Sequence, residues 1–518
     1  MYAITDRIRE VLRLDPAAEA IEFEGRWHPW KELSAIVDDI DGLLAAAGLG
    51  PDIAVGVLLR NRPSLVAALV AVLSTRRCVV TINPHLGESK LAADVSALCT
   101  PVIVADHEDW ARPALASAAA AAGSMGLALT DDPARPVVPV VGLDRPGPGS
   151  HHEPLPGVAV EMLTSGTTGP PKRVRLGYAA LQRSLLGASH YEQGKQGAEQ
   201  ARLRQGVVII SAPLVHVGGM WRAVQCVVDG RRMALLERFQ VEPWVDLVRR
   251  HRPKTASLVP AALRMVLDAD VARGDLASLK AVMSATAPLP PETALAFEEK
   301  YGVPVLVSYG ATEFAGGVAG WTLADHRKWA EAKRGSVGRA HPGCELRVVD
   351  PVDGRILPPG HQGLLEAKSS QLGEGSGWTR TTDLAIIDAD GFLWIKGRAD
   401  NAIIRGGFKI IPGEVVEVLQ RHPSVREASV VGLPDERLGQ VPVAAVELAD
   451  GAPAVDGEAL RAFAREHLAS YQVPKEIRVV GRLPRTPSMK VSEGDVRALF
   501  EGRPTETTDE RCAGEGGQ

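Results

Sequence analysis

Short apolar runs alternate with helix-like segments along the first 150 residues of the chain. Residues 52–59 (DIAVGVLL) and 78–82 (CVVTI) are nearly continuous apolar stretches, and residues 65–73 (LVAALVAVL) between them fit a helix. Strands that are apolar on both faces are typical of a parallel sheet covered by helices, because both faces must be buried. The alternation therefore predicts an α/β fold with mostly parallel sheets.

The later parts of the chain predict further domains. Alternation returns between residues 205 and 320, and shorter strands separated by Gly and Asp predict a small β subdomain over about residues 335–399. A hairpin-like run, helices and strands then predict a compact α+β domain over residues 401–502. Because 518 residues exceed one ordinary core, we expect a large domain over residues 1–399 and this smaller one. Residues 503–518 are expected to be a disordered tail.

Charge and cysteine usage narrow the class of protein. Lys and Arg number 58 against 63 Asp and Glu, so the chain lacks the basic excess that covers a nucleic-acid backbone. Five scattered cysteines without a Cys-x-x-Cys pair argue against a disulfide scaffold or a structural zinc site. The longest aliphatic run, residues 65–73, is half the length of a membrane-spanning helix. We expect a soluble cytoplasmic protein without nucleic-acid or membrane partners.

The sharpest motif is LTSGTTGPPK, residues 163–172. Its glycines let a ligand approach the backbone, and its hydroxyl and N–H groups suit an anion, to which the lysine adds a positive charge. It lacks the Walker spacing, and two prolines remove donors. Taken alone, it is equally compatible with a polar turn before a strand. The candidate ligand-binding residues are Thr164, Ser165, Gly166, Thr167, Thr168, Gly169 and Lys172.

Four more motifs follow in order. They are SYGATEF (308–314), TRTTDLA (379–385), KGRADNAIIRGGFKIIPGEVVEVL (396–419) and PRTPSMK (484–490). Together with the first motif they resemble the ANL superfamily of adenylate-forming enzymes, over about residues 20–500. The likeness is to its stand-alone acyl-CoA ligases, since no carrier-protein domain follows residue 500. The resemblance implies a large N-terminal domain and a mobile C-terminal domain joined by a hinge at Asp400.

The resemblance also implies a two-step reaction. A carboxylate attacks the α-phosphate of ATP, which gives an acyl-adenylate and pyrophosphate. The thiol of coenzyme A then attacks the acyl carbon, and AMP leaves. The implied partners are a small-molecule carboxylic acid, ATP with Mg²⁺, and CoA, and both a monomer and a homodimer remain open.

Individual residues acquire roles from the same resemblance. The first motif, with Lys172, would hold the β- and γ-phosphates, Thr312 would contact the α-phosphate, and Glu313 would bind Mg²⁺. Lys490 would act in adenylation, which makes Lys172, Thr312, Glu313 and Lys490 the implied catalytic set. Tyr309 would stack on adenine, Asp383 would accept from the ribose, and Arg398 would reach the ribose or phosphate. The implied nucleotide site is completed by Ala285, Thr286, Ala287, Ser308 and Gly310.

The acyl pocket and the CoA side are implied less sharply. His216 matches a position beside the acyl pocket, although a packed core histidine is an alternative. Small residues there suggest room for a bulky acid, and the Ala-, Arg- and Gly-rich composition suggests secondary metabolism in a high-GC bacterium. The pocket residues are His216, Val217, Gly218, Gly219, Trp221, Ala287 and Gly310. Gly406, Gly407 and Phe408 are expected on the CoA side.

Four departures from the family pattern fall on the nucleotide side. The pattern has glycine where this chain has Arg173, Thr382 and Met489, and has Gly-Gly-Ala-Pro where this chain has residues 285–288 (ATAP). If those glycines have positive φ, each replacement costs roughly 1–2 kcal/mol or bends the loop. Two alternatives to a full ligase follow. The chain would then perform only the thioesterification of a preformed acyl-adenylate with CoA, or bind an adenylate without catalysis.

Overall fold

The computed structural model describes residues 3–163, 173–193, 200–311, 314, 316–372, 377–406, 408–486 and 489–501. Two compact units divide these residues. The first contains the described residues up to 345 and those of 368–377, and the second contains those of 346–367 and those from 378 onwards. Each unit is described by itself.

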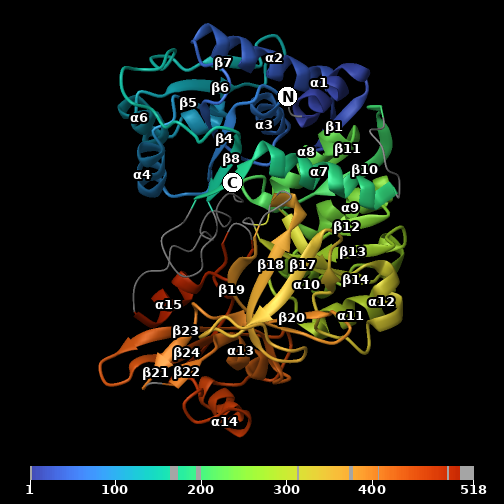
Figure 1. The fold of residues 1–518 in the computed structure, drawn as a ribbon, viewed down its shortest axis with the longest axis vertical. Coiled ribbons are helices and arrows are strands. Elements are labelled where there is room, and N and C mark those ends of the chain that lie inside the picture. Colours follow the sequence, from blue (N-terminus) through green and yellow to red (C-terminus); the bar gives the residue numbers. More distant parts are fainter. Residues whose placement is uncertain are drawn as a thin grey trace, which may run out of the picture. The chain divides into compact units, whose positions relative to one another are not determined.

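The largest sheet of the first unit has seven strands in the order β7-β6-β5-β3-β4-β8-β9. Figure 1 labels β4, β5, β6, β7 and β8 of this sheet. Its four central pairs, β6-β5, β5-β3, β3-β4 and β4-β8, are parallel, as the apolar runs predict. The strands are β3 (Ala54–Leu58), β4 (Cys78–Ile82), β5 (Val102–Asp106), β6 (Met125–Leu129), β7 (Val137–Pro139), β8 (Val158–Leu163) and β9 (Arg173–Gly177). The helices of this region are α1 (Ala3–Leu14), α2 (Trp30–Ala46), α3 (Pro63–Ser74), α4 (Glu88–Leu98), α5 (His107–Trp110), α6 (Pro113–Ala121) and α7 (Tyr178–Gln193).

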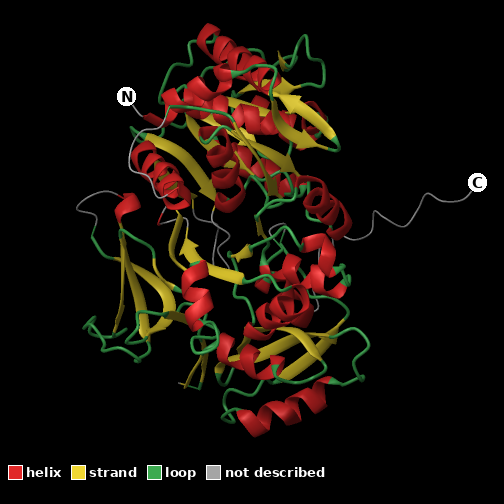
Figure 2. Cartoon of the chain, turned by 90° about the vertical axis from the view of Figure 1, so that its right-hand side faces the viewer, coloured by secondary structure: helices red, strands yellow, loops and turns green. Residues whose placement is uncertain are grey.

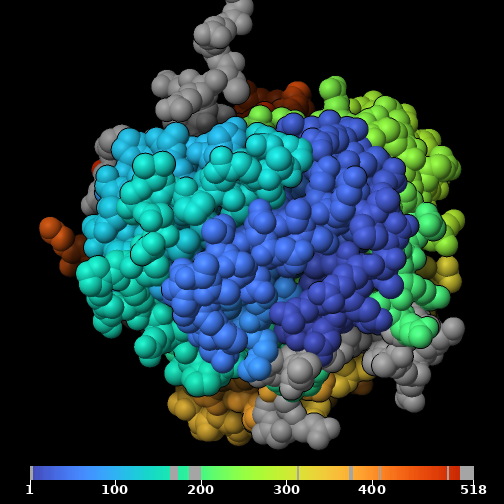
Figure 3. Space-filling view, turned by 90° about the horizontal axis from the view of Figure 1, so that it is seen from above, coloured from blue at the N-terminus to red at the C-terminus, as the bar shows by residue number. Residues whose placement is uncertain are grey.

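α3 is the buried central helix of this region. Every residue of this helix except Ser64 is buried, so the apolar run at 65–73 is a helix covered on all sides. α1 and α2 pack on α3, with Ile8 and Ile40 fully buried in the same core. Figure 3 shows the outer side of this region, where the N-terminal residues (blue to cyan) form a continuous surface.

Two further sheets complete the first unit. A four-stranded sheet, β10-β11-β1-β2, contains β1 (Glu19–Phe23), β2 (Arg26–Pro29), β10 (Arg204–Ile210) and β11 (Arg231–Leu235), with α8 (Val217–Val228) and α9 (Val241–His251). A five-stranded sheet contains β12 (Thr255–Ser257), β13 (Ala281–Ser284), β14 (Val305–Ala311), β15 (Gly316–Gly320) and β16 (Arg339–Ala340) in chain order. Its helices are α10 (Pro260–Asp268), η1 (Arg273–Leu276), α11 (Pro291–Tyr301) and α12 (Leu323–Trp329).

Most strand pairs of the second unit are antiparallel, and one pair, that of its last strand, is parallel. Figure 2 shows the strands of the chain in yellow and its helices in red. β17 (Cys344–Val349), β18 (Gly363–Ser369), β19 (Thr379–Ile387) and β20 (Leu393–Arg398) form a four-stranded sheet. η3 (Ser370–Leu372), which follows β18, is grouped with the first unit. A second sheet has the order β22-β21-β24-β23, with β25 beside β24. Its elements are β21 (Ile403–Arg405), β22 (Phe408–Ile410), α13 (Pro412–Gln420), β23 (Val425–Asp435), β24 (Gly439–Leu448), α14 (Gly457–His467), β25 (Glu476–Val480) and α15 (Glu493–Glu501).

The α/β class, the mostly parallel sheets and the separate C-terminal α+β region are confirmed. The predicted hairpin at 401–410 is the antiparallel pair β21-β22. Contacts group residues 378–399 with the C-terminal elements, and the hinge at Asp400 stays a prediction. The expected tail at 503–518 lies outside the described residues. Across the described part of the chain, no helix combines the length and hydropathy needed to cross a bilayer.

Candidate active site

Two neighbouring parallel strands of the first unit bring part of the predicted nucleotide site together. β13 ends at Ser284, which is in register with Val307 of β14. Residues 285–287 therefore leave β13 beside residues 308–310 on β14. Ligands of parallel sheets bind beyond the carboxyl ends of the strands. The two segments thus share the edge at which a nucleotide is expected, with Tyr309 half-buried there.

Gly310 is required by the backbone around it. It pairs with Gly317 of β15, and a Cβ on Gly310 would lie 2.4 Å from the carbonyl oxygen of Gly316 and 2.7 Å from Cα of Gly317. These are backbone atoms, which cannot turn aside as a side chain does. Any larger residue would open the hairpin between β14 and β15, so this glycine has a structural reason that is independent of a ligand.

The segment before α8 is fixed by a buried asparagine. Asn61 donates from Nδ2 to the carbonyl oxygens of Ala212 (3.1 Å) and Leu236 (2.9 Å), and its Oδ1 accepts from the N–H of Leu214 (2.7 Å). His216 follows this segment as the residue directly before α8, in an extended conformation. Two of these hydrogen bonds hold the loop that leads into residues 216–221, and the third ties it to the segment after β11.

The two predicted pocket glycines at the start of α8 differ. A Cβ on Gly219 would lie 2.3 Å from the carbonyl oxygen of Pro213, so this glycine lets the helix pack on its own preceding loop. A Cβ on Gly218 would meet no atom within 4 Å. Only Gly218 faces open space.

A buried serine connects α8 with β15. Trp221 Nε1 donates to Ser184 Oγ at 2.8 Å. A Cβ on Gly316 would lie 3.2 Å from the same oxygen and 3.0 Å from Gln371 Oε1. The structure therefore places the predicted residue Trp221 close to the β14-β15 hairpin that contains Gly310. Sequence reasoning missed Ser184 and Gln371, because an isolated serine or glutamine carries no motif.

His341 is a second residue that the sequence did not single out. Its ring lies against β15, where a Cβ on Gly320 would come within 2.7 Å of Cε1. Burial lowers the pKa of the His341 imidazole, because it disfavours the charged form. The glycines of β15 leave the room that this ring occupies.

In the second unit, β19 and β20 bring Asp383 and Arg398 together as directly paired residues. The Arg398 guanidinium donates from Nε and Nη2 to Thr382 Oγ1 (3.1 and 2.8 Å) and to the carboxylate of Asp400 (2.9 and 2.6 Å). Asp383 is half-buried, and its N–H donates to Thr381 Oγ1 at 3.0 Å. Arg398 is therefore held between β19 and the predicted hinge residue.

Lys490 belongs to the same unit and is partly buried. Burial, and secondly the positive charge of Arg398, lower the pKa of the Lys490 ammonium. Burial raises the pKa of the Glu493 carboxyl, which accepts from Asn401 Nδ2 at 3.1 Å. The positive charge of Arg398 therefore acts on a partly buried lysine, whereas the Arg398 guanidinium itself is 37% exposed and is paired with Asp400.

The predicted CoA side is a hairpin end. Gly406 has φ of +56° and donates its N–H to the carbonyl oxygen of Leu438 at 2.8 Å. Phe408 is 57% exposed and stacks on Tyr471, with ring centroids 4.7 Å apart. The hairpin thus presents an aromatic surface.

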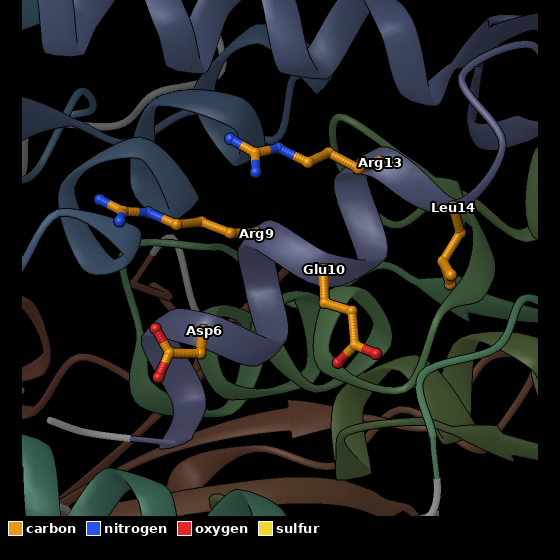
Figure 4. A pocket seen from close by; sticks show the side chains of 5 residues that line it. All are labelled: Asp6, Arg9, Glu10, Arg13 and Leu14. Carbon is orange, nitrogen blue, oxygen red and sulfur yellow. The ribbon is translucent and has the colours of Figure 1, made fainter.

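Several predicted residues lie outside the described part of the chain. They are Thr164, Ser165, Gly166, Thr167, Thr168, Gly169, Lys172, Thr312, Glu313 and Gly407. Among the residues that are described, no three His, Cys, Asp or Glu side chains form a group suited to a metal ion. A surface pocket along α1 is lined by Asp6, Arg9, Glu10, Arg13 and Leu14 (Figure 4). None of these is a predicted site residue.

Comparison with known proteins decides the family. The AMP-binding enzyme model matches residues 8–376, and the model of the AMP-binding enzyme C-terminal domain matches residues 414–490. The chain belongs to the AMP-binding enzymes. The prediction of an AMP-forming acid–thiol ligase of the adenylate-forming superfamily is thereby confirmed, together with its fold.

Individual relatives of this AMP-binding enzyme agree. It is 30% identical to the indoleacetate–CoA ligase of Aromatoleum aromaticum over 94% of this chain and 96% of the relative. It is 32% identical to the sulfoacetate–CoA ligase of Cupriavidus necator over 86% and 87% of the two chains. Among solved structures, the o-succinylbenzoate CoA synthetase of Bacillus subtilis in complex with its acyl-adenylate intermediate is similar, with a TM-score of 0.73, 25% identity, and coverage of 95% and 97%.

The four departures of this AMP-binding enzyme from the family pattern are of two kinds. Met489 and Thr286 have φ of +62° and +76°, in the region that favours glycine. Arg173 and Thr382 do not have positive φ, and both side chains make hydrogen bonds. The condition for strain, a positive φ, is therefore met at Met489 and Thr286 and is not met at Ala285, Arg173 or Thr382.

Arg173 is directed into the protein. Its Nη1 donates to the carbonyl oxygen of Thr81 at 2.9 Å, and its Nη2 donates to both carboxylate oxygens of Asp94 at 3.0 Å. This side chain ties the first residue of β9 to β4 and α4. The charge of Arg173 is therefore already paired with Asp94.

Proposed function

We propose that this enzyme converts a bulky carboxylic acid to its CoA thioester through an acyl-adenylate. The carboxylate oxygen attacks the α-phosphorus of ATP, and the bond to pyrophosphate breaks. The CoA sulfur then attacks the acyl carbon, the thiol loses its proton, and the bond to AMP breaks. Amounts of AMP and thioester formed are therefore equal.

The observation that carries this proposal is the half-buried Lys490 in the short hairpin of the second unit. Lys490 is partly buried and feels the charge of Arg398, which lowers its pKa. An ammonium held in a partly buried place gains from an anionic ligand, such as a carboxylate approaching a phosphate. Lys490 would bind the reacting oxygens, and Arg398 would bind the nucleotide beside Asp383. The charge of both side chains would stabilise the phosphorus centre as negative charge develops there.

Bound Mg²⁺ would neutralise phosphate charge. Its predicted ligand, Glu313, lies outside the described residues. The proposed tasks of the described residues do not depend on where the ion sits.

The proposal of a bulky acid rests on small residues at the sheet edge. Residues 284–287 and 308–311 contain only Ser, Ala, Thr and Gly, apart from Tyr309. Gly316 and Gly317 continue this character on β15. Two of the named relatives act on aromatic acids, indoleacetate and o-succinylbenzoate, and one acts on the small sulfoacetate.

The test is a comparison of those three acids. Purified enzyme with ATP and Mg²⁺ is given indole-3-acetate, 2-succinylbenzoate or sulfoacetate, and pyrophosphate release is measured with and without CoA. We expect pyrophosphate with an aromatic acid and a thioester of matching mass once CoA is present. Faster turnover of sulfoacetate would overturn the bulky-acid proposal.

The alternatives give different results in the same experiment. An enzyme restricted to thioesterification releases no pyrophosphate but converts synthetic indoleacetyl-adenylate and CoA to thioester. A non-catalytic protein binds that adenylate without consuming it. The paired charge of Arg173 and the formed hairpin at Lys490 support the full reaction.

A further inference from the structure

We propose that Arg485 is a positioning residue for adenylation, which holds Lys490 in place through the carbonyl group of Met489 and is itself fixed by Glu427. The proposal rests on the proposed function of Lys490. All four residues belong to the second unit.

Lys490 lies in a short hairpin. Arg485 pairs with Val491 across it, and the N–H of Ser492 donates to the carbonyl oxygen of Pro484 at 2.8 Å. Thr486 donates its N–H to the carbonyl oxygen of Lys490, and Met489 donates its N–H to that of Thr486, both at 2.8 Å. A hairpin of this length ends in a left-handed residue, usually glycine. Here Met489 occupies that position, with φ of +62°.

Arg485 makes two contacts that fix the end of this turn. Its Nη1 donates to the carbonyl oxygen of Met489 at 2.9 Å, and its Nη2 forms an ion pair with the Glu427 carboxylate. Glu427 is on β23, which pairs with β24 over ten positions. A guanidinium is a rigid planar fork, so anchoring one arm on a sheet sets the place of the other. The peptide between Met489 and Lys490 is thereby tied to the sheet.

This tie opposes two forces on the hairpin. A residue with a Cβ is strained in the left-handed conformation, which favours relaxation of the turn. Arg398 also repels the ammonium of Lys490. Without the Arg485 contact, both forces would displace Lys490 from the position that adenylation requires. Displacement by about 1 Å can cost on the order of 100-fold in rate.

The test separates the two half-reactions. Arg485→Met and Glu427→Gln are compared with Arg421→Met, which breaks an exposed pair with Glu417 in the same unit. Pyrophosphate release is measured with whichever of indole-3-acetate, 2-succinylbenzoate and sulfoacetate the unaltered enzyme uses best, and thioester formation with indoleacetyl-adenylate and CoA. In Arg485→Met we expect adenylation to fall about 10- to 100-fold, and thioester formation to be retained. Glu427→Gln should have a smaller effect in the same direction, and Arg421→Met none.

A second measurement does not depend on activity. The full chain is treated with acetic anhydride, and acetylation of Lys490 is followed by mass spectrometry relative to Lys475, which pairs with Asp435. We expect Lys490 to be labelled faster in Arg485→Met and in Arg485→Lys than in the unaltered enzyme. Unchanged labelling, or an equal fall of both half-reactions, would overturn the role of Arg485. Absence of pyrophosphate release by the unaltered enzyme would instead count against the proposed function.

Discussion

At the start of β9 and in the Lys490 hairpin, this enzyme has a side chain where the adenylate-forming pattern has glycine. Arg173 at β9 does not have positive φ and makes three hydrogen bonds to β4 and α4. Met489 in the hairpin has φ of +62°, and its carbonyl oxygen accepts a hydrogen bond from Arg485. The same kind of departure is therefore a stabilising contact in one region and a strained turn in the other.

The largest expected effect is on the adenylation step, in which only the hairpin region is proposed to take part. Lys490→Ala should lower pyrophosphate release about 100- to 1,000-fold, because it removes the positive charge that would stabilise the reacting α-phosphate. Thioester formation from synthetic indoleacetyl-adenylate should persist. Lys475→Ala is the control, because this exposed lysine pairs with Asp435 in the same unit. Equal loss in both variants would show that the hairpin has no special part in adenylation.

Replacing Arg173 by glycine should destabilise its region by about 2 kcal/mol, because charged hydrogen bonds are lost and Asp94 is left without this partner. Hydrogen exchange of peptides that cover β4 and β9 measures the change. Arg145→Gly is the control, since this side chain is 87% exposed, and a change within about 0.5 kcal/mol is expected. A stabilised Arg173→Gly enzyme would mean that strain dominates here too.

Met489→Gly should change stability in the opposite direction to Arg173→Gly. Removing the Cβ from a left-handed residue should stabilise the hairpin by up to about 1 kcal/mol, seen as slower hydrogen exchange of the Thr486 and Met489 amides. Met489→Ala keeps the Cβ and should show no such gain. If Met489→Gly and Arg173→Gly change stability in the same direction, the contrast between the two regions is wrong.

The smallest expected effect concerns pH. The pKa of Lys490 is lowered from 10.5, so the folded enzyme binds this proton less readily than the unfolded chain does. Folding therefore carries a penalty at neutral pH that disappears as pH rises through the folded pKa towards 10.5. Relative to Lys490→Met, the unaltered enzyme should gain stability over this range, measured as urea midpoints. A difference that is constant with pH would place Lys490 in solvent.

Much of the fold follows from the sequence. The apolar runs at 52–59, 65–73 and 78–82 predict β3, α3 and β4, because a parallel strand and its covering helix have distinct local patterns. The five ordered motifs predict the family, since each combines residue types at fixed spacing. Neither inference needs contacts between distant residues.

Other features needed the structure. Ser184 and Gln371 lie close to Gly316 although they are far from it in the chain, and no local sequence pattern predicts this contact. Likewise, the sequence alone predicts strain equally at Arg173 and Met489. The two differ because φ and the partners Asp94, Thr81 and Arg485 are set by how strands and helices pack.

The sequence by itself determined the α/β class, the family and the identity of the lysine proposed for adenylation, because these depend on residue types and on distances along the chain. Only the tertiary structure decided which departures from the family pattern are strained and which are contacts. A backbone dihedral angle and a hydrogen-bond partner are properties of the packed chain, so no reading of neighbouring residues could supply them.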